Sequence, residues 1–144
     1  MSAVMDRVDR NTRSRMMQGI RDRNTVPELL VRQALNRRGI KYRLNATNLP
    51  GRPDIINRKR QLAIQVRGCF WHQHSCKNGH LPKSRTGYWH KKLLGNVARD
   101  KTNDQFLRKM GFKLFIIWEC WTKDYERINR SVDKISKEYF KANV

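Results

Sequence analysis

The sequence predicts an α/β domain in which helices flank a mixed central β-sheet. Three observations support this fold class: two short apolar runs joined by a turn within residues 53–68, a longer apolar run at residues 112–120, and helical patterns before, between and after them. At 144 residues, the chain can bury a substantial core. We therefore expect a single domain over residues 1–144, of which residues 1–11 form a flexible polar tail.

The N-terminal part of the chain contains two helical patterns. Residues 12–21 are compatible with a short helix. Residues 25–39 give a clearer one, because Thr25 and Glu28 have the spacing of a capping box and Gly39 stands where the helix would end.

Three strands are predicted next. Residues 40–45 read as a short strand. Residues 53–57 and 61–68 read as two further strands, and the turn between them contains the sequence "RKR".

The C-terminal half alternates helix, strand and helix. A long helical pattern runs from about Gly87 to Met110 and stops at Gly111. The run "FKLFIIWEC" at residues 112–120 is almost wholly apolar, which predicts a central strand covered on both faces. A last amphipathic helix is predicted over residues 124–140.

The charge of the chain indicates a polyanionic partner. Lys and Arg number 32 against 12 Asp and Glu, which gives a net charge of +20. Such a surplus favours nucleic acid over a membrane surface. No apolar run approaches the roughly 20 residues of a membrane span, and the first residues lack the apolar stretch of a signal peptide. We therefore expect a cytoplasmic protein that binds nucleic acid.

The three cysteines predict a metal site. Cys69, His74 and Cys76 form the pattern C-x4-H-x-C, and Cys120 follows the apolar strand. Three cysteines leave no complete disulfide set, whereas three thiolates and one imidazole complete a tetrahedral zinc shell. A structural Zn²⁺ is therefore expected; the alternative is three buried thiols beside an exposed histidine. His72 stays outside this set.

The predicted hairpin carries a second candidate site. Its Pro-Asp pair, followed by the second strand, resembles the PD-(D/E)-x-K hairpin of metal-dependent nucleases, with Gln65 in place of the acid and Arg67 in place of the lysine. Asp54 can anchor a hard divalent cation, and His72 has a suitable pKa to accept a proton from water. The alternatives are an aspartate that caps a turn and a plain surface histidine.

Four sequence blocks carry a more specific resemblance: "LPGRPDI", "GCFWHQHSC", "TGYW…KKLLGNVARDK" and "GFKLFIIWEC". In order and spacing they resemble those of the very-short-patch-repair (Vsr) mismatch endonucleases of bacteria, from about Asn11 to Cys120. The resemblance implies a restriction-endonuclease-like core. It also implies an enzyme that nicks one DNA strand beside the thymine of a T:G mismatch, the lesion left when 5-methylcytosine deaminates.

The resemblance also implies roles for individual residues. Asp54 matches the aspartate that binds Mg²⁺, and the backbone carbonyl of Val66 matches a second Mg²⁺ ligand. His72 matches the proposed general base, while Glu28 and Asp100 match acids that support the site through bound water. Glu28 can equally serve the capping box, and Asp100 can equally be a solvated helix charge. The matches to the structural zinc ligands are Cys69, His74, Cys76 and Cys120.

DNA contacts are implied as well. In the family, aromatic side chains wedge into the duplex beside the mismatch, where a wobble pair stacks poorly and insertion costs less. One stripe of the long predicted helix would face the groove and reach base edges. The residues predicted to bind DNA are Phe70, Trp71 and Trp89 as the wedge, Lys92 and Asn96 on the stripe, Met17 on the opposite side of the mismatch, and Arg52 in the loop before Asp54.

Arg67 departs from the family pattern, in which histidine usually precedes the block "GCFWH". An arginine does not exchange protons near neutral pH, although it can hold a phosphate oxygen. Two hypotheses follow: a Mg²⁺-dependent nicking endonuclease for T:G mismatches, and a non-cleaving or weakly cleaving relative that binds mismatched or distorted DNA. A third is a sequence-specific, restriction-like enzyme that cuts both strands of matched DNA.

The expected partner is double-stranded DNA with a T:G mismatch. A monomer is expected, because a mismatch has no two-fold symmetry for a dimer to match. Family members can also cooperate with general mismatch-repair proteins.

Overall fold

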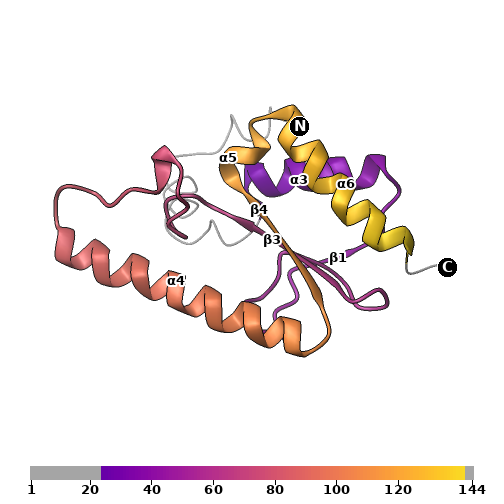
Figure 1. Cartoon of the computed structure of the whole chain (residues 1–144), viewed down its shortest axis with the longest axis horizontal. Helices are drawn as coiled ribbons and strands as arrows, with labels where there is room; N and C mark the ends of the chain where they lie inside the picture. Colours follow the sequence, from indigo (N-terminus) through magenta and orange to yellow (C-terminus); the bar gives the residue numbers. More distant parts are fainter. Residues whose placement is uncertain (1–23, 142–144) are drawn as a thin grey trace, which may run out of the picture.

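A computed structural model describes residues 24–141. Over this range the elements follow the predicted order (Figure 1). They are α3 (Val26–Arg37), β1 (Arg43–Leu44), β2 (Ile55–Asn57), β3 (Leu62–Arg67), the 3-10 helix η2 (Lys77–Gly79), α4 (Thr86–Lys109), β4 (Lys113–Trp118), α5 (Glu119–Thr122) and α6 (Tyr125–Lys141).

The four strands form one mixed sheet in the order β1-β2-β3-β4. Strands β1, β2 and β3 pair antiparallel, as the predicted hairpin requires. Strands β3 and β4 pair in parallel, with Gln65 opposite Ile116. A parallel pair needs a long crossover connection, and α4 lies within it. The predicted mixed sheet with flanking helices is therefore confirmed.

Strand β4 lies at an edge of the sheet, so the prediction of a central position for residues 112–120 is wrong. Within the described residues it pairs with β3 alone. The predicted coverage of both faces is confirmed, since Phe115 and Ile117 pack with α3 and α6 while Leu114 packs near Leu107 of α4. An almost wholly apolar strand thus indicates that helices cover both of its faces. It does not indicate how many strands pair with it.

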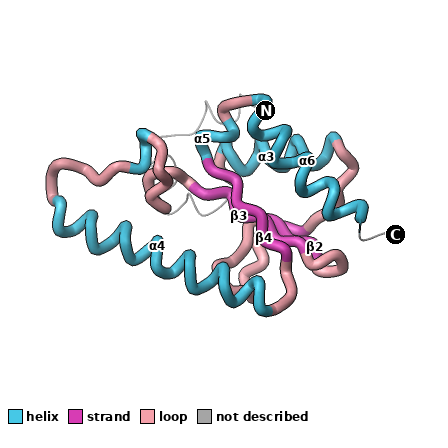
Figure 2. The backbone as a smooth tube through the Cα atoms, viewed as in Figure 1, coloured by secondary structure: helices cyan, strands magenta, loops and turns pink. Residues whose placement is uncertain are grey.

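The helices form two layers around the sheet. Helices α3 and α6 lie together on one face, and α4 runs along the other (Figure 2). Within β3, Leu62 and Ile64 enter the core beneath α3 and α6. Arg67 points the other way and pairs with Asp104 of α4. Side chains of β3 thus alternate between an apolar face and a face that carries charge.

Helix α3 begins close to the predicted cap. The hydroxyl of Thr25 accepts a hydrogen bond from the N–H of Glu28 at 3.3 Å, which is one half of a capping box. The carboxylate of Glu28 does not return to Thr25 but accepts from the N–H of Asn24 at 3.0 Å. The cap therefore buries Glu28 at the start of the helix, against the sheet layer.

Helices α3 and α4 both end at a predicted glycine. Gly39 and Gly111 adopt left-handed backbone angles, with φ of 72° and 97°. The next amide bonds back to a carbonyl in the last turn, from Ile40 to Leu35 and from Phe112 to Leu107. Each end is thus a Schellman motif, which needs the positive φ that glycine tolerates.

Some predictions fall outside the described residues. These are the tail at residues 1–11, the helix at residues 12–21 and the DNA contact of Met17. Across residues 24–141, none of the helices combines the length and apolar character that crossing a bilayer requires.

Candidate active site and metal group

Asp54 stands directly before β2 and is buried against the neighbouring strand. Its Oδ2 accepts a hydrogen bond from the N–H of Val66 in β3 at 2.7 Å. Burial raises the pKa of Asp54 to about 7, and the nearby charge of Glu28 adds to the shift, while the Val66 N–H opposes it. A buried carboxylate of this kind gains most from a positive ligand. The hairpin thus brings the two predicted Mg²⁺ ligands, Asp54 and Val66, together.

Glu28 and Arg32 form an ion pair one helical turn apart in α3. The Nη2 of Arg32 lies 2.9 Å from Oε2 of Glu28. Burial raises the pKa of Glu28, and the N–H of Asn24 and the charge of Arg32 oppose that shift. Both side chains lie close enough to Asp54 to act on its pKa. The predicted acid Glu28 is therefore beside Asp54, and the cap that holds it there does not conflict with a role in the site.

Arg67 is buried in a network of charges. Its Nη2 donates to Oδ1 of Asp104 at 2.6 Å, and its Nε lies 3.9 Å from Oδ2 of Asp100. Its charge also lowers the pKa of Asp54. Arg67 therefore contacts the acids of α4 and is near enough to Asp54 for its charge to act on the pKa of that carboxyl group.

His72 contacts the second acid of this network. Its Nδ1 lies 2.5 Å from Oδ2 of Asp100. A carboxylate can only accept here, so Nδ1 carries the proton and Nε2 of the neutral ring remains an acceptor. Both residues line a cavity of about 460 Å³ between α4 and the loop that follows β3. Asp100 thus contacts His72 directly, and its support of the site through bound water stays a prediction.

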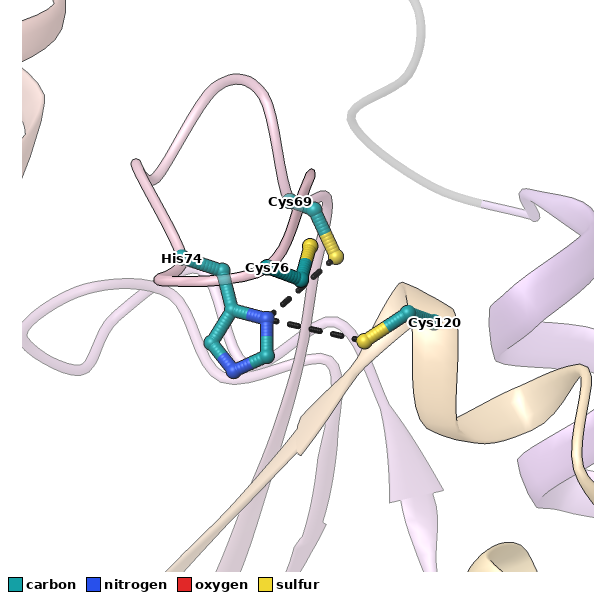
Figure 3. A group of neighbouring side chains, drawn as sticks. All are labelled: Cys69, His74, Cys76 and Cys120. Atoms are coloured by element: carbon teal, nitrogen blue, oxygen red, sulfur yellow. Dashed lines mark hydrogen bonds between the residues drawn. The ribbon is translucent and has the colours of Figure 1, made fainter. Parts of the chain in front are cut away.

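The four predicted zinc ligands form one compact group. The ligand atoms of Cys69, His74, Cys76 and Cys120 all lie within 4.8 Å of one another. Figure 3 shows them pointing toward one another, three from the loop after β3 and Cys120 from α5. The Nδ1 of His74 is 3.7 Å from the sulfur of Cys69 and 3.5 Å from that of Cys120.

These distances fit a metal better than they fit hydrogen bonds. In a tetrahedral Zn²⁺ site, bond lengths of 2.3 Å to sulfur and about 2.05 Å to nitrogen place the two ligand atoms about 3.6 Å apart. Burial raises the pKa of the Cys69 thiol and lowers that of His74. A metal would therefore displace protons from sulfur and find the imidazole neutral. The donor set and its spacing fit one divalent metal ion.

Neighbouring residues fix the loop around this group. The ring of His74 stacks on Trp118 with centroids 4.2 Å apart. The carboxylate of Glu119 accepts from the N–H of Cys69 at 3.2 Å. A Cβ at position 79 would stand 1.8 Å from the carbonyl oxygen of His74, so Gly79 is needed for this close approach. The metal group thus has supports from β4, α5 and η2.

The predicted aromatic wedge forms a cluster beside the metal group. The rings of Phe70, Trp71 and Trp89 have centroids 5.1 to 6.0 Å apart. Tyr88 extends the cluster, edge-on to Trp89 at 5.1 Å. Trp71 and Tyr88 are exposed, with 37% and 49% of their surface in solvent. Large apolar rings gathered on the surface mark an interaction site.

The predicted stripe of α4 faces this cluster. Lys92 lies over the ring of Trp71, with Nζ 5.8 Å from the ring centre. The amide of Asn96 donates to the carbonyl of Trp71 at 3.0 Å, so it holds the loop. Arg52 is exposed in the loop before Asp54 and has a φ of 46°. Trp89, Lys92, Asn96 and Asp100 thus all face the loop between β3 and α4.

Comparison with known proteins decides the family. A sequence profile described as DNA mismatch endonuclease Vsr matches residues 5–78. The chain is 42% identical to the Type II nicking enzyme V.NmeAIP of Neisseria meningitidis, over 85% of this chain and 91% of that protein. It is 35% identical to the DNA mismatch endonuclease Vsr of Escherichia coli, over 83% of this chain and 77% of that protein. This chain belongs to the Vsr family.

A third relative, the Type II nicking enzyme V.XorIIP of Xanthomonas oryzae, is 42% identical over 84% of this chain and 89% of its own length. Membership of the Vsr family makes this chain a DNA endonuclease, a hydrolase with a restriction-endonuclease-like fold. The large positive charge of the chain agrees with that substrate.

Three residues of this Vsr site were missed by the sequence analysis. Arg32 was read as part of a helix, although it lies four positions after Glu28, a spacing that pairs charges on one face. Asp104 lies four positions after Asp100, but two acids at this spacing give no pairing signal, and its partner Arg67 is 37 positions away. Tyr88 precedes the predicted wedge residue Trp89 and could have been included with it.

Proposed function

We propose that this Vsr-family chain nicks one DNA strand beside the thymine of a T:G mismatch, by Mg²⁺-dependent hydrolysis of the phosphodiester bond, in very short patch repair. The observation that carries the proposal is the continuity of the site. The positive charge of Arg67 lowers the pKa of the buried Asp54 carboxyl group, and Arg67 adjoins the Asp100–His72 pair. One cluster thus contains a carboxylate for a cation, a fixed positive charge and a base.

Each group has a distinct role in the proposed reaction. Asp54 and the carbonyl of Val66 would hold Mg²⁺, which when bound polarises the phosphate and acidifies water. His72 accepts the proton of the attacking water at Nε2, because Asp100 holds the ring in that tautomer. Glu28 orients bound water beside Asp54. Arg67 supplies positive charge to the phosphate and transfers no proton.

The metal group is proposed to hold a structural Zn²⁺. Four protein ligands leave no open position, so a metal there stiffens the loop and takes no part in hydrolysis. The stiffened loop carries His72 and the aromatic cluster. A rigid loop loses less entropy when its rings enter DNA.

The aromatic cluster is proposed to enter the duplex at the mismatch. Phe70, Trp71 and Trp89 unstack one base step, at a cost that is lower where a wobble pair already stacks poorly. Lys92 and Arg52 contact the DNA from either side, and Asn96 acts on the DNA through the loop that it holds. The enzyme would act as a monomer on DNA in the bacterial cytoplasm, with general mismatch-repair proteins as further partners.

The test uses labelled duplexes that carry one T:G mismatch in varied flanking sequences, with Mg²⁺ or with EDTA. We expect a nick on the thymine strand that requires Mg²⁺ and is absent from the matched duplex. Cleavage of both strands of matched DNA would instead indicate a sequence-specific enzyme. Nicking that persists in EDTA would overturn the metal-dependent mechanism.

A second candidate function follows from Arg67. Its guanidinium is buried and paired with Asp104, so it offers no proton for transfer. If the reaction needs proton transfer at this position, the protein binds mismatched or distorted DNA and cuts it weakly or not at all. Tight binding to the T:G duplex without a nick in any flanking sequence would favour this function.

Replacing Trp71 by Ala is expected to weaken binding to the T:G duplex by about 10- to 100-fold, because a ring that stacks on a base contributes about 1–3 kcal/mol. Binding to the matched duplex should change much less, since the ring has no favourable place to enter. Fluorescence anisotropy with both duplexes measures the two dissociation constants. Tyr125→Ala removes a more exposed ring on α6 and serves as the control. An equal loss on both duplexes would contradict a mismatch-specific wedge.

A further inference from the structure

The charged network around Arg67 contains one acid to which neither the sequence nor the family resemblance gives a role. Asp104 lies on α4, and its Oδ1 accepts from Nη2 of Arg67 at 2.6 Å. Arg67 and Asp104 are 6% and 8% exposed, so the contact is among the most buried ion pairs of the described residues. Both side chains line the cavity that also contains His72 and Asp100.

The contacts of the Arg67 guanidinium indicate how Asp104 can affect the site. The guanidinium has two carboxylates near it: Asp104 in contact, and Asp100 at 3.9 Å from Nε. The same oxygen of Asp100, Oδ2, holds Nδ1 of His72 at 2.5 Å. Arg67 and His72 therefore face one oxygen from two sides, and only His72 is within hydrogen-bond distance of it.

Removing Asp104 would change which carboxylate the guanidinium of Arg67 contacts. A buried guanidinium without its partner carries a large desolvation penalty and moves to the nearest carboxylate that can pair with it. Here that carboxylate is Asp100. The displaced guanidinium would then compete with His72 for Oδ2 and would leave its place near Asp54.

We propose that Asp104 is a positioning residue of the active site, which acts through Arg67. Asp104 holds the guanidinium where its charge reaches the Asp54 side of the site, and it leaves Asp100 free to orient His72. The inference rests on the proposed nicking function, and it goes beyond it by giving a role to an acid that touches neither substrate nor metal. Arginine at position 67 and aspartate at position 104 thus act as one unit.

The experiment compares wild type with D104N, R67M and the double variant R67M/D104N. Single-turnover nicking of the T:G duplex is measured over a range of enzyme concentrations, which separates the rate constant at saturation from the concentration at half-saturation. D104N keeps the size of the side chain and an oxygen acceptor, and it loses the charge. Circular dichroism and urea unfolding establish that each variant is folded at the assay temperature.

We expect D104N to lower the saturating rate constant by about tenfold, with little change in half-saturation, because DNA contacts are retained while the reacting groups are misplaced. R67M should lower it by about 100-fold. The double variant should be no slower than R67M, since Asp104 has no effect once Arg67 is gone. The matched control is D133N, the same change in the Asp133–Arg38 pair between α6 and the C-terminal end of α3, which should retain the wild-type rate.

The inference would be overturned, while the proposed function stands, by a wild-type rate for folded D104N or by losses in the double variant that multiply as for independent residues. A loss confined to half-saturation would equally overturn it, because Asp104 would then act on DNA binding. A wild-type protein that nicks no duplex would overturn the proposed function itself, and with it the inference.

Discussion

Replacing Asp54 by Asn is expected to abolish nicking and, at the same time, to make the metal-free protein more resistant to unfolding at pH 8. Asn cannot supply the negative charge that a divalent cation needs. It keeps an oxygen that can accept from the N–H of Val66, so the hairpin contact survives. Loss of activity with a gain of stability would identify Asp54 as a functional residue that the fold does not need.

The stability gain follows from the pKa of Asp54, which burial raises from 3.8 to about 7. The folded protein binds this proton more tightly than the unfolded chain does. The contribution of the carboxyl group to stability is therefore full below pH 3.8 and is lost as the pH rises through 7. At pH 8 the buried charge costs at most about 4 kcal/mol, and the Asn variant avoids that cost.

Urea unfolding in EDTA at pH 5 and pH 8 measures this effect. The advantage of Asp54→Asn should be larger at pH 8, and D133N should show no comparable change, because Asp133 is exposed. Added Mg²⁺ should stabilise the wild type at pH 8 and leave the variant unchanged, since a ligand stabilises only the state that binds it. A variant that nicks DNA, or one less stable than wild type at pH 8, would contradict the role given to Asp54.

Local patterns predicted much of the fold. Capping residues and terminal glycines act over a few positions, and the structure keeps both glycines and one half of the capping box. The edge position of β4 was not predictable in the same way. The apolar run "FKLFIIW" indicates that helices cover both faces of that strand. The order of strands in the sheet depends instead on which strand backbones pair with each other, often between distant parts of the chain.

The two candidate sites also differ in how far their residues could be predicted from the sequence. The metal group was predictable, because cysteine and histidine are scarce and their chemistry limits what they can do together. The pairing of Arg67 with Asp104 joins residues 37 positions apart, and nothing in either local sequence selects the partner. In a chain with 32 basic residues, one arginine gives no sign that it is buried. Only the packing of α4 on the sheet brings it against an acid.

Replacing His74 by Ala is expected to release the proposed Zn²⁺, lower the melting temperature by about 10 °C or more, and abolish both nicking and mismatch binding. The loop between β3 and α4 has η2 as its one regular element within the described residues. Its own backbone hydrogen bonds are those of short turns, such as the bonds from His72 N–H to the Gly68 carbonyl and from His74 N–H to the Cys69 carbonyl. That loop carries Phe70, Trp71 and His72. Its metal group ties it to α5 through Cys120.

His80→Ala is the matched control, because His80 lies in the same loop, is exposed, and donates to the carbonyl of Lys77 outside the metal group. Zinc content, thermal unfolding and duplex binding of the two variants, measured side by side, separate loss of the metal from loss of a histidine. Retention of metal and stability in His74→Ala would show that the group does not need the imidazole. Loss of metal with full nicking would show instead that contacts independent of the imidazole, such as the bond from Cys69 N–H to Glu119 and the bond from Asn96 to the Trp71 carbonyl, hold His72 in place. The role of the metal in forming the active site would then have to be withdrawn.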